Sequence, residues 1–340
     1  MRLWRFLLSM LILTDADLRS ALKMREVIGA VERGFRAMAQ GAGVMPQRLR
    51  LDIPNRDAVL LEMPSYLRSE VGTAGERVGL GTKVVGVFPQ NTGRGLEVIQ
   101  AVYLLLDPET GAPLSLMEGR FITAIRTAAT SAVATKLMAT PGPKQLGVFG
   151  AGVQARFHIE AMIEVADITR VMIVSRTVEK ARKLCENVRA VHRLPCDNVS
   201  AEEAASQADL ICTCTTSPTP LFDGKTIKRG AHINAVGAFT PANRELDTAA
   251  VLRSRVIIDA DSAAGREAGE ILIPVTEGAI QTAHVKGTLA DVLSGKVAGR
   301  ESDEEITLFR SCGLAIEDLV TAKLAYENAI SKGIGTRVEL

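Results

Sequence analysis

The pattern of apolar and polar residues changes character along the chain. In the first 120 or so residues, short apolar runs alternate with a period of two between Gly- and Pro-rich turns, as in a mixed or antiparallel sheet. A helical pattern over residues 16–39 precedes most of them, with Thr14 or Asp15 as its cap. The predicted strands are residues 10–13, 48–52, 58–63, 79–87, 99–106 and 113–117, with a loop at 89–95 and a turn at 107–113.

After this region the pattern becomes an alternation of strands and helices that continues to about residue 260. A helix of small residues over 127–138 leads into it, and residues 307–332 have the spacing of an amphipathic helix that would pack back on the first domain. We therefore predict an α/β protein with two domains. Residues 10–126 and 314–340 form an α+β sheet domain completed by the C-terminal helix, and residues 127–313 form a Rossmann dinucleotide-binding domain.

The first residues resemble a signal peptide only superficially. Arg2 and Arg5 precede an apolar run that is too short to span a bilayer, and no small-residue cleavage site follows it. We expect Met10 to be the true start and residues 1–9 to be a non-native or disordered extension.

Composition narrows the class of partner. The 340 residues carry a formal net charge of +1 and only 4% aromatic side chains, so neither nucleic acid nor a membrane surface is an expected partner. The five cysteines are an odd number without disulfide-scaffold spacing, which suits a reducing cytoplasm. Cys212 and Cys214 share one face of a predicted strand and are expected to pack there, and the four histidines supply no matching pair for a metal site.

The segment GAGVQA (150–155) directly follows an apolar run and has G-x-G-x-x-A spacing. Gly150 permits a tight turn, Gly152 lets bare backbone approach a diphosphate, and Ala155 lets the next helix pack close to the sheet. The anion then lies at the N-terminus of that helix, which Val153 and Gln154 begin. A tight structural turn is the alternative, but a second strand at 169–174 follows one helix later and favours a dinucleotide site.

The end of that second strand indicates which cofactor binds. NAD sites usually place a carboxylate there, whereas NADP sites supply Arg and small hydroxyls for the 2′-phosphate. This chain has Ser175, Arg176 and Thr177, with no carboxylate before Glu179. NADP(H) is therefore favoured, with NAD(H) as a second cofactor, although a solvated Arg176 beside an N-cap at Thr177 would also explain the sequence.

Several distinctive motifs occur in order over residues 10–327. They are MPQR (45–48), EMPSY (62–66), GTKVV (81–85), LLLDPETGAPLSLMEGRFITAIRTAATSAVATKLM (104–138), GVFGAGVQA (147–155), GAHINAVGA (230–238), RELD (244–247) and TLFRSCGLAIEDLVTAKLAYE (307–327). Together they resemble the ornithine cyclodeaminase/mu-crystallin family. The resemblance implies a Rossmann domain and a sheet domain through which two copies dimerise, and it adds Val236 and Gly237 to the cofactor-binding residues.

Arg48, Lys83 and Arg126 are candidate substrate-binding and catalytic residues. Each is a cation beside an apolar strand or a helix of small residues, and three converging cations would hold one carboxylate. The resemblance implies the same role for them; unrelated surface cations are the alternative. A Lys83 buried between two cations would have a lowered pKa and could pass a proton during reduction of a C=N bond. Glu62 is a further candidate substrate-binding residue, as an acid/base or as a partner of Lys83, or else it is an exposed strand-end carboxylate.

Phe239 is where this chain departs from part of the family. Ornithine cyclodeaminases and alanine dehydrogenases of this fold carry an Asp there, two residues after Gly237. Phe239 cannot accept a proton, so we expect an apolar wall of the substrate site suited to a pyrroline or piperideine ring, with simple core packing as the alternative.

The sequence thus favours NAD(P)H-dependent reduction of cyclic imino acids to L-proline or L-pipecolate. Alanine dehydrogenase or N-alkyl amino acid dehydrogenase activity stays open, as does a non-enzymatic, mu-crystallin-like binding protein, whereas ornithine cyclodeamination is the least favoured.

Overall fold

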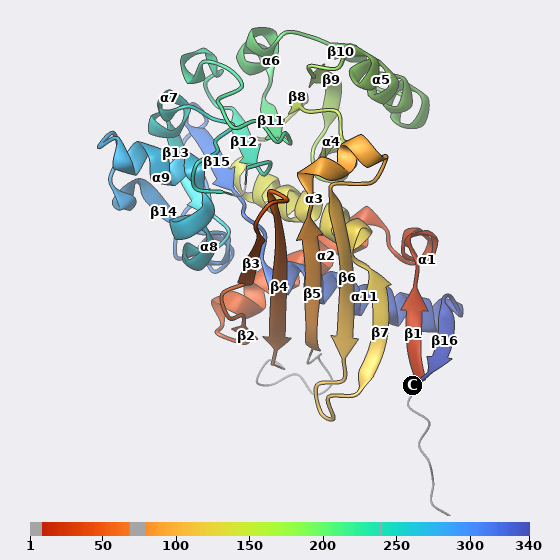
Figure 1. Cartoon of the computed structure of the whole chain (residues 1–340). Helices are drawn as coiled ribbons and strands as arrows, with labels where there is room; N and C mark the ends of the chain where they lie inside the picture. The colour runs from red at the N-terminus through yellow and green to blue at the C-terminus, as the bar shows by residue number, and fades with distance from the viewer. Residues whose placement is uncertain (1–8, 69–78, 239) are drawn as a thin grey trace, which may run out of the picture. The chain divides into compact units, whose positions relative to one another are not determined.

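The computed structural model describes residues 9–68, 79–238 and 240–340. They divide into two compact units, Met1–Arg126 with Leu314–Leu340, and Thr127–Gly313, each built around its own sheet (Figure 1). In the described part of the chain, no helix combines the length and apolar character needed to cross a bilayer.

The sheet of the first unit is mixed. Its strand order is β16-β1-β7-β6-β5-β4-β2, with β3 also paired to β4, and among these pairs only β1 and β7 run parallel. The strands are β1 (Ser9–Leu13), β2 (Gly43–Val44), β3 (Leu49–Ile53), β4 (Ala58–Leu67), β5 (Gly79–Val87), β6 (Ile99–Leu106), β7 (Pro113–Glu118) and β16 (Thr336–Glu339).

Helices cover one face of this sheet. The helix α11 (Ala315–Lys332) packs on β4, β5 and β6, and α2 (Met24–Ala39) packs on α11. An apolar stripe of Val27, Val31 and Phe35, all at most 1% exposed, anchors α2. The other helical elements of this unit are α1 (Asp15–Ala21), the 3₁₀ turn η1 (Pro89–Arg94) and the first part of α3 (Gly119–Met138).

The second unit is a Rossmann fold with eight parallel strands in the order β10-β9-β8-β11-β12-β15-β13-β14. The chain leaves β8 towards β9 and later returns to β11 on the other side of β8, which creates a switch point at the carboxyl ends of these strands. The strands are β8 (Lys144–Phe149), β9 (Ile168–Val174), β10 (Cys196–Asn198), β11 (Leu210–Thr213), β12 (His232–Ala235), β13 (Ser254–Ile258), β14 (Val285–Thr288) and β15 (Ile306–Arg310).

Short helices connect these strands. They are α4 (Val153–Val165), α5 (Val178–His192), α6 (Ala201–Gln207), α7 (Thr248–Leu252), α8 (Asp261–Glu267), α9 (Gly269–Thr276) and α10 (Leu289–Leu293), with 3₁₀ turns η2 (Gly224–Thr226) and η3 (Thr282–His284). Apolar side chains that share one face of the sheet, such as Phe149 and Leu308, belong to a large core cluster of the unit.

Three sequence predictions need correction. The single helix over 16–39 is two helices, because the chain is extended at Leu22 and Lys23. The helix over 307–332 begins only at Ala315, and residues 307–310 belong to β15, a strand buried on both faces whose apolar run has no period of two. Ser9, assigned to the terminal extension, pairs with Glu339 in the sheet, while residues 1–8 lie outside the described part.

Candidate active site

Lys83, Arg126, Glu317 and Asp318 form a buried cluster of charged side chains in the first unit. Lys83 Nζ donates to Asp318 Oδ2 at 2.7 Å, and Arg126 Nε donates to the other oxygen, Oδ1, at 3.0 Å. Arg126 Nη1 also donates to Glu317 Oε2 at 2.6 Å. All four side chains are at most 6% exposed. One carboxylate therefore joins two of the three predicted substrate-binding cations.

Strand alternation explains why Lys83 is buried. In β5, Gly81, Lys83 and Val85 point to the face that α11 covers, while the residues between them point to the opposite face. Tyr103 of β6 lies directly opposite Lys83 on the same face. A Cβ at Gly81 would come within 2.5 Å of Tyr103 Oη, so the glycine makes room for the aromatic side chain beside Lys83.

The two acidic residues occupy the first turn of α11. Free backbone N–H groups and the helix dipole favour carboxylates at this end of a helix. Glu317 Oε1 accepts the backbone N–H of Leu314 at 3.1 Å, which fixes the start of the helix. The same turn therefore caps α11 and supplies the anionic half of the cluster.

The pKa values of Lys83 and Arg126 shift in opposite directions. Burial lowers the pKa of Lys83 to about 8; Asp318 opposes this effect, and the charges of Arg126 and Arg48 add to it. Burial also acts to lower the pKa of Arg126, but Asp318 and Glu317 outweigh it and the net shift is upwards. Arg126 is thus a permanent cation, whereas Lys83 can exchange its proton near neutral pH.

Arg48 lies immediately before β3 and is half-buried. Its charge lowers the pKa of Lys83, so it stands within electrostatic range of the cluster. The three predicted cations are therefore all associated with one part of the first unit, with Lys83 and Arg126 in direct contact with the same carboxylate.

Glu62 lies on the other face of the sheet. It is exposed and pairs with Val84, whereas its neighbour Met63 is the residue that pairs with Lys83. The prediction that Glu62 is the partner of Lys83 is therefore wrong, and that partner is Asp318. Glu62 is instead an exposed carboxylate on a strand, as the alternative interpretation of the sequence had it.

The glycine loop follows β8 in the second unit. Gly150 has φ +115°, and a Cβ there would lie 2.8 Å from the carbonyl oxygen of Cys214. Gly152 is the N-cap of α4, and a Cβ there would meet nothing within 4 Å. Ala155 is fully buried, while Val153 is 54% exposed at the first position of the helix. The loop therefore offers bare backbone and open space at a helix N-terminus beside the switch point, which fits a dinucleotide diphosphate.

The residues predicted to select the cofactor, Ser175, Arg176 and Thr177, directly follow β9. Arg176 and Thr177 are exposed, and Ser175 Oγ accepts the backbone N–H of Thr177 at 3.2 Å. The nearest following carboxylate, Glu179, is engaged by Arg182, with Nε and Nη2 donating at 3.0 and 2.8 Å. Thr177 occupies the N-cap position of α5, but its side chain makes no capping hydrogen bond.

Glu245 joins the loops that follow β11 and β12. Its carboxylate accepts Thr213 Oγ1 at 2.7 Å, both the backbone N–H and Oγ1 of Thr215 at 2.6 and 2.7 Å, and the backbone N–H of Gly237 at 2.8 Å. The side chain is fully buried, and burial raises the pKa of Glu245 although the hydrogen bonds from Thr215 and Thr213 lower it. The segment with Val236 and Gly237, predicted to bind the cofactor, is therefore tied through Glu245 to the end of β11.

Sequence reasoning missed both Glu245 and Asp318. Each lies inside a motif that was recognised, RELD and GLAIEDL, but neither received a role. The signal for Asp318 is an acidic pair among apolar residues at the start of a helix that packs on the sheet, since two buried carboxylates need cations as partners. Phe239, the predicted apolar wall, lies outside the described residues.

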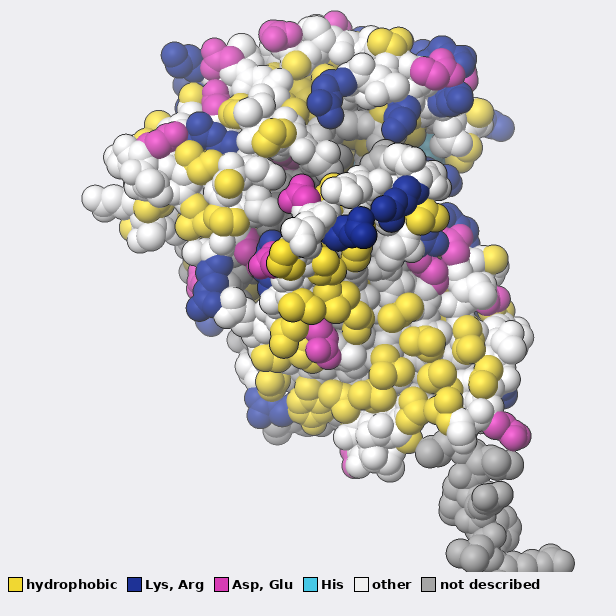
Figure 2. Space-filling view, viewed as in Figure 1, with side chains coloured by type: hydrophobic (Ala, Val, Ile, Leu, Met, Phe, Trp, Pro, Cys, Tyr) yellow, Lys and Arg dark blue, Asp and Glu magenta, His cyan; other side chains and the backbone are white. Residues whose placement is uncertain are grey.

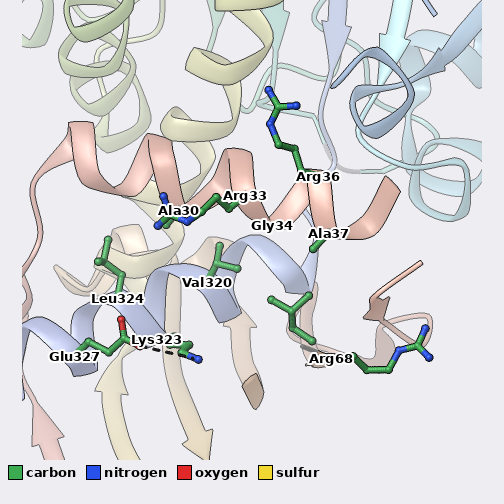
Figure 3. Close-up of a pocket in the computed structure, with 11 residues that line it drawn as sticks. Ala30, Arg33, Gly34, Arg36, Ala37, Arg68, Val320, Lys323, Leu324 and Glu327 are labelled. Atoms are coloured by element: carbon green, nitrogen blue, oxygen red, sulfur yellow. Dashed lines mark ion pairs between the residues drawn. The ribbon is translucent and has the colours of Figure 1, made fainter. Parts of the chain in front are cut away.

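A separate cavity of about 240 Å³ lies between α2 and α11 (Figure 3). Val320 and Leu324 line it from α11, on the side of the helix opposite Asp318, and Gly34 lines it from α2. Figure 3 shows Arg36 extending from α2 away from α11. None of the predicted substrate or cofactor residues lines this cavity, so it is distinct from the charged cluster.

Within the described ranges, no group of three or more His, Cys, Asp or Glu side chains is arranged to hold a metal ion. Cys212 is buried and Cys214 half-buried, and burial raises the pKa of Cys212 to about 12, as expected for a thiol that packs in the core.

Comparisons with known proteins agree over nearly the whole chain. The model of the ornithine cyclodeaminase/mu-crystallin family matches residues 9–333. A Delta(1)-pyrroline-2-carboxylate reductase of Bacillus cereus is 38% identical over 97% of this chain and 100% of its own length.

Two solved structures are similar as well. The Thermococcus litoralis Delta(1)-pyrroline-2-carboxylate reductase in complex with NADH and L-proline has a TM-score of 0.93 and 42% identity, covering 97% of this chain and 100% of that one. An archaeal alanine dehydrogenase dimer with bound NAD has a TM-score of 0.90 and 35% identity, covering 98% of this chain and 99% of that one.

Proposed function

Because the chain belongs to the ornithine cyclodeaminase/mu-crystallin family, we propose that it is an NAD(P)H-dependent oxidoreductase that reduces the C=N bond of cyclic imino acids. Its substrates are pyrroline-2-carboxylate or piperideine-2-carboxylate, and its products L-proline or L-pipecolate. The observation that carries the proposal is the 42% identity over 97% of the chain to a reductase that holds NADH and L-proline.

The charged cluster of the first unit supplies the substrate site in this proposal. Arg48, Lys83 and Arg126 bind the substrate carboxylate, with the guanidinium groups offering paired N–H donors and Lys83 a point charge. The nicotinamide, when bound, supplies the hydride for the imine carbon. Lys83 gives the proton that the imine nitrogen takes up, a role supported by its lowered pKa of about 8.

The second unit binds the dinucleotide. The diphosphate lies over Gly150 and Gly152 at the start of α4, and the loop containing Val236 and Gly237 borders the nicotinamide. We favour NADP(H) with NAD(H) as a second cofactor, because Arg176 is exposed at the end of β9 while the carboxylate of Glu179 is engaged by Arg182. The similar structures hold NADH and NAD, so titration of this protein with NADPH and NADH tests the preference for NADP(H).

Alanine dehydrogenase activity is the second candidate, favoured by the similarity to an archaeal enzyme of that name. An enzyme that starts from pyruvate must form and dehydrate a carbinolamine, for which a base is useful, whereas a preformed cyclic imine needs none. In the sequence, Phe239 occupies the position at which alanine dehydrogenases of this fold carry an Asp, so we place this activity and N-alkyl amino acid reduction second. Ornithine cyclodeamination is the third candidate, and a purely non-enzymatic binding role is the last.

We also propose a homodimer formed through the exposed face of the first sheet. Hydrophobic side chains gather on this face (Figure 2). Strand register places Leu49, Leu51 and Val102, which are 45–58% exposed, on the face that carries Glu62. A contiguous apolar surface of this kind is typical of a protein interface. The five free thiols suit a reducing compartment, so we place the enzyme in the cytoplasm.

A substrate screen tests the proposed reaction. Oxidation of NADPH and NADH is followed with pyrroline-2-carboxylate, piperideine-2-carboxylate, and pyruvate with ammonia or methylamine. Turnover with a cyclic imine should exceed turnover with either pyruvate mixture, and Arg48→Ala should depress it. Faster turnover with pyruvate and ammonia would make the protein an alanine dehydrogenase instead.

A further inference from the structure

Lys83 is a buried cation in surroundings that oppose its charge. Its cross-strand neighbours on the same face are Met63, which is apolar, and Tyr103, whose phenol has its pKa raised first by burial and then by Asp318. The guanidinium groups of Arg126 and Arg48 also disfavour a proton on Lys83. In the described part of the chain, Asp318 is the carboxylate hydrogen-bonded to Lys83.

The position of the Asp318 carboxylate is fixed from two directions. Its backbone belongs to the first turn of α11, and its Oδ1 is held by Arg126 Nε at 3.0 Å while Oδ2 receives Lys83 Nζ at 2.7 Å. The side chain is 0% exposed, so bulk water does not compete for these oxygens. Charge-assisted hydrogen bonds of this length in a buried site are strong, and they favour the charged form of both partners.

We infer that Asp318 is a positioning residue that keeps Lys83 protonated and aimed, so that Lys83 can donate a proton to the substrate nitrogen. The inference rests on the proposed reductase function. As the hydride adds to the imine carbon, the C=N π electrons become a nitrogen lone pair that takes a proton from Lys83 Nζ. Lys83 is left as a neutral amine beside Asp318 and recovers its proton from solvent.

Glu317 provides a matched control because it belongs to the same cluster without touching Lys83. It pairs with Arg126 at 2.6 Å, is equally buried, and is not among the largest causes of the pKa shift of Lys83. Asp318→Asn and Glu317→Gln each remove one negative charge from one turn of one helix. The removed carboxylate contacts Lys83 in Asp318→Asn only.

The test compares the pH dependence of kcat/KM for pyrroline-2-carboxylate in the full-length wild type and both variants. The wild type should lose activity above about pH 8, where Lys83 deprotonates. In Asp318→Asn the midpoint of that loss should fall by at least one pH unit, which is roughly a fivefold extra loss at pH 8 that approaches tenfold at higher pH. Glu317→Gln should lower kcat/KM with a much smaller shift of its midpoint, because its carboxylate makes no hydrogen bond to Lys83. Protonation of the substrate itself is common to all three proteins and cancels in the comparison.

A loss in Asp318→Asn that is equal at every pH, or an equal shift in both variants, would overturn the inference and leave Asp318 with a structural role. If the wild type reduces no imino acid, the proposed function fails instead. The Lys83 proton is then read by NMR of ¹³C-labelled lysine, with its signal assigned by loss in Lys83→Arg. If Asp318→Asn does not fold, this wild-type measurement tests the inference in its place. A Lys83 that is neutral at pH 7 would contradict the inference, and one that is charged supports it.

Discussion

Gly150 and Gly152 lie two positions apart in one loop, yet the structure predicts opposite consequences for replacing them by alanine. Gly150 has φ +115°, and its added methyl group would meet the carbonyl of Cys214 at 2.8 Å. Gly152 has φ −96°, which alanine readily adopts, and nothing lies within 4 Å of its Cβ position. Gly150→Ala should therefore damage the fold, and Gly152→Ala should damage cofactor binding.

The expected sizes follow from these contacts. Backbone strain at Gly150 costs about 1–3 kcal/mol, which lowers Tm by about 2–4 °C for each kcal/mol in a unit of this size. At Gly152, the entropy gain of about 0.4–1 kcal/mol from replacing glycine offsets a comparable loss at the N-cap, so Tm should stay within about 3 °C. The same methyl group would keep a diphosphate from the N-terminus of α4, a loss of about 1.5–3 kcal/mol or roughly 10- to 100-fold in Kd.

Thermal unfolding without cofactor and calorimetric titration with NADPH and NADH measure both effects. The two variants act as controls for each other, since each should change one observable far more than the other relative to wild type. A Gly152→Ala protein that binds both dinucleotides as tightly as wild type would refute the placement of the diphosphate at α4. A Gly150→Ala protein of unchanged Tm would refute the steric argument.

Three further predictions concern the cofactor, the substrate and the reaction type. Arg176→Ala should weaken NADPH binding by about 1.5–3 kcal/mol and NADH binding far less, because a charge-assisted phosphate contact is lost; equal losses in titrations with both cofactors would contradict this. Alanine at Arg48, Lys83 or Arg126 should raise KM or lower kcat for the imino acid in steady-state assays while leaving the Kd of NADPH nearly intact, and unchanged kinetics would remove the substrate site from the first unit. Because Phe239 offers no lone pair, an ammonia assay with ornithine should detect no release, and robust release would show that another residue serves as the base.

Local sequence pattern was sufficient for much of the fold. The strands predicted at 79–87 and 99–106 coincide with β5 and β6, and Thr14 caps α1 with a complete capping box. These elements carry their own signals, namely a period of two between turns and a capping residue followed by an acid. The two-residue strand β2 and the C-terminal strand β16 were missed, because their pairing depends on distant partners and short runs carry no periodicity.

In the candidate site, too, residues with a local sequence signal were found and contacts between distant residues were not. Residue type and motif spacing identified Lys83 and Arg126, which the structure places on one carboxylate. Asp318 was not found because it lies more than 190 residues from both, and a pattern along the chain does not reveal a contact at that separation. Glu62 was misplaced because a one-residue step along a strand reverses the face to which a side chain points.

The central claim is that this protein transfers a hydride from a nicotinamide cofactor to the imine carbon of a cyclic imino acid. The most direct measurement uses NADPH deuterated at the transferred position with pyrroline-2-carboxylate, followed by mass spectrometry and chiral analysis of the product. We predict L-proline that carries one deuterium at its α-carbon. Proline without deuterium, or no proline from this substrate while pyruvate and ammonia give deuterated alanine, would contradict the claim.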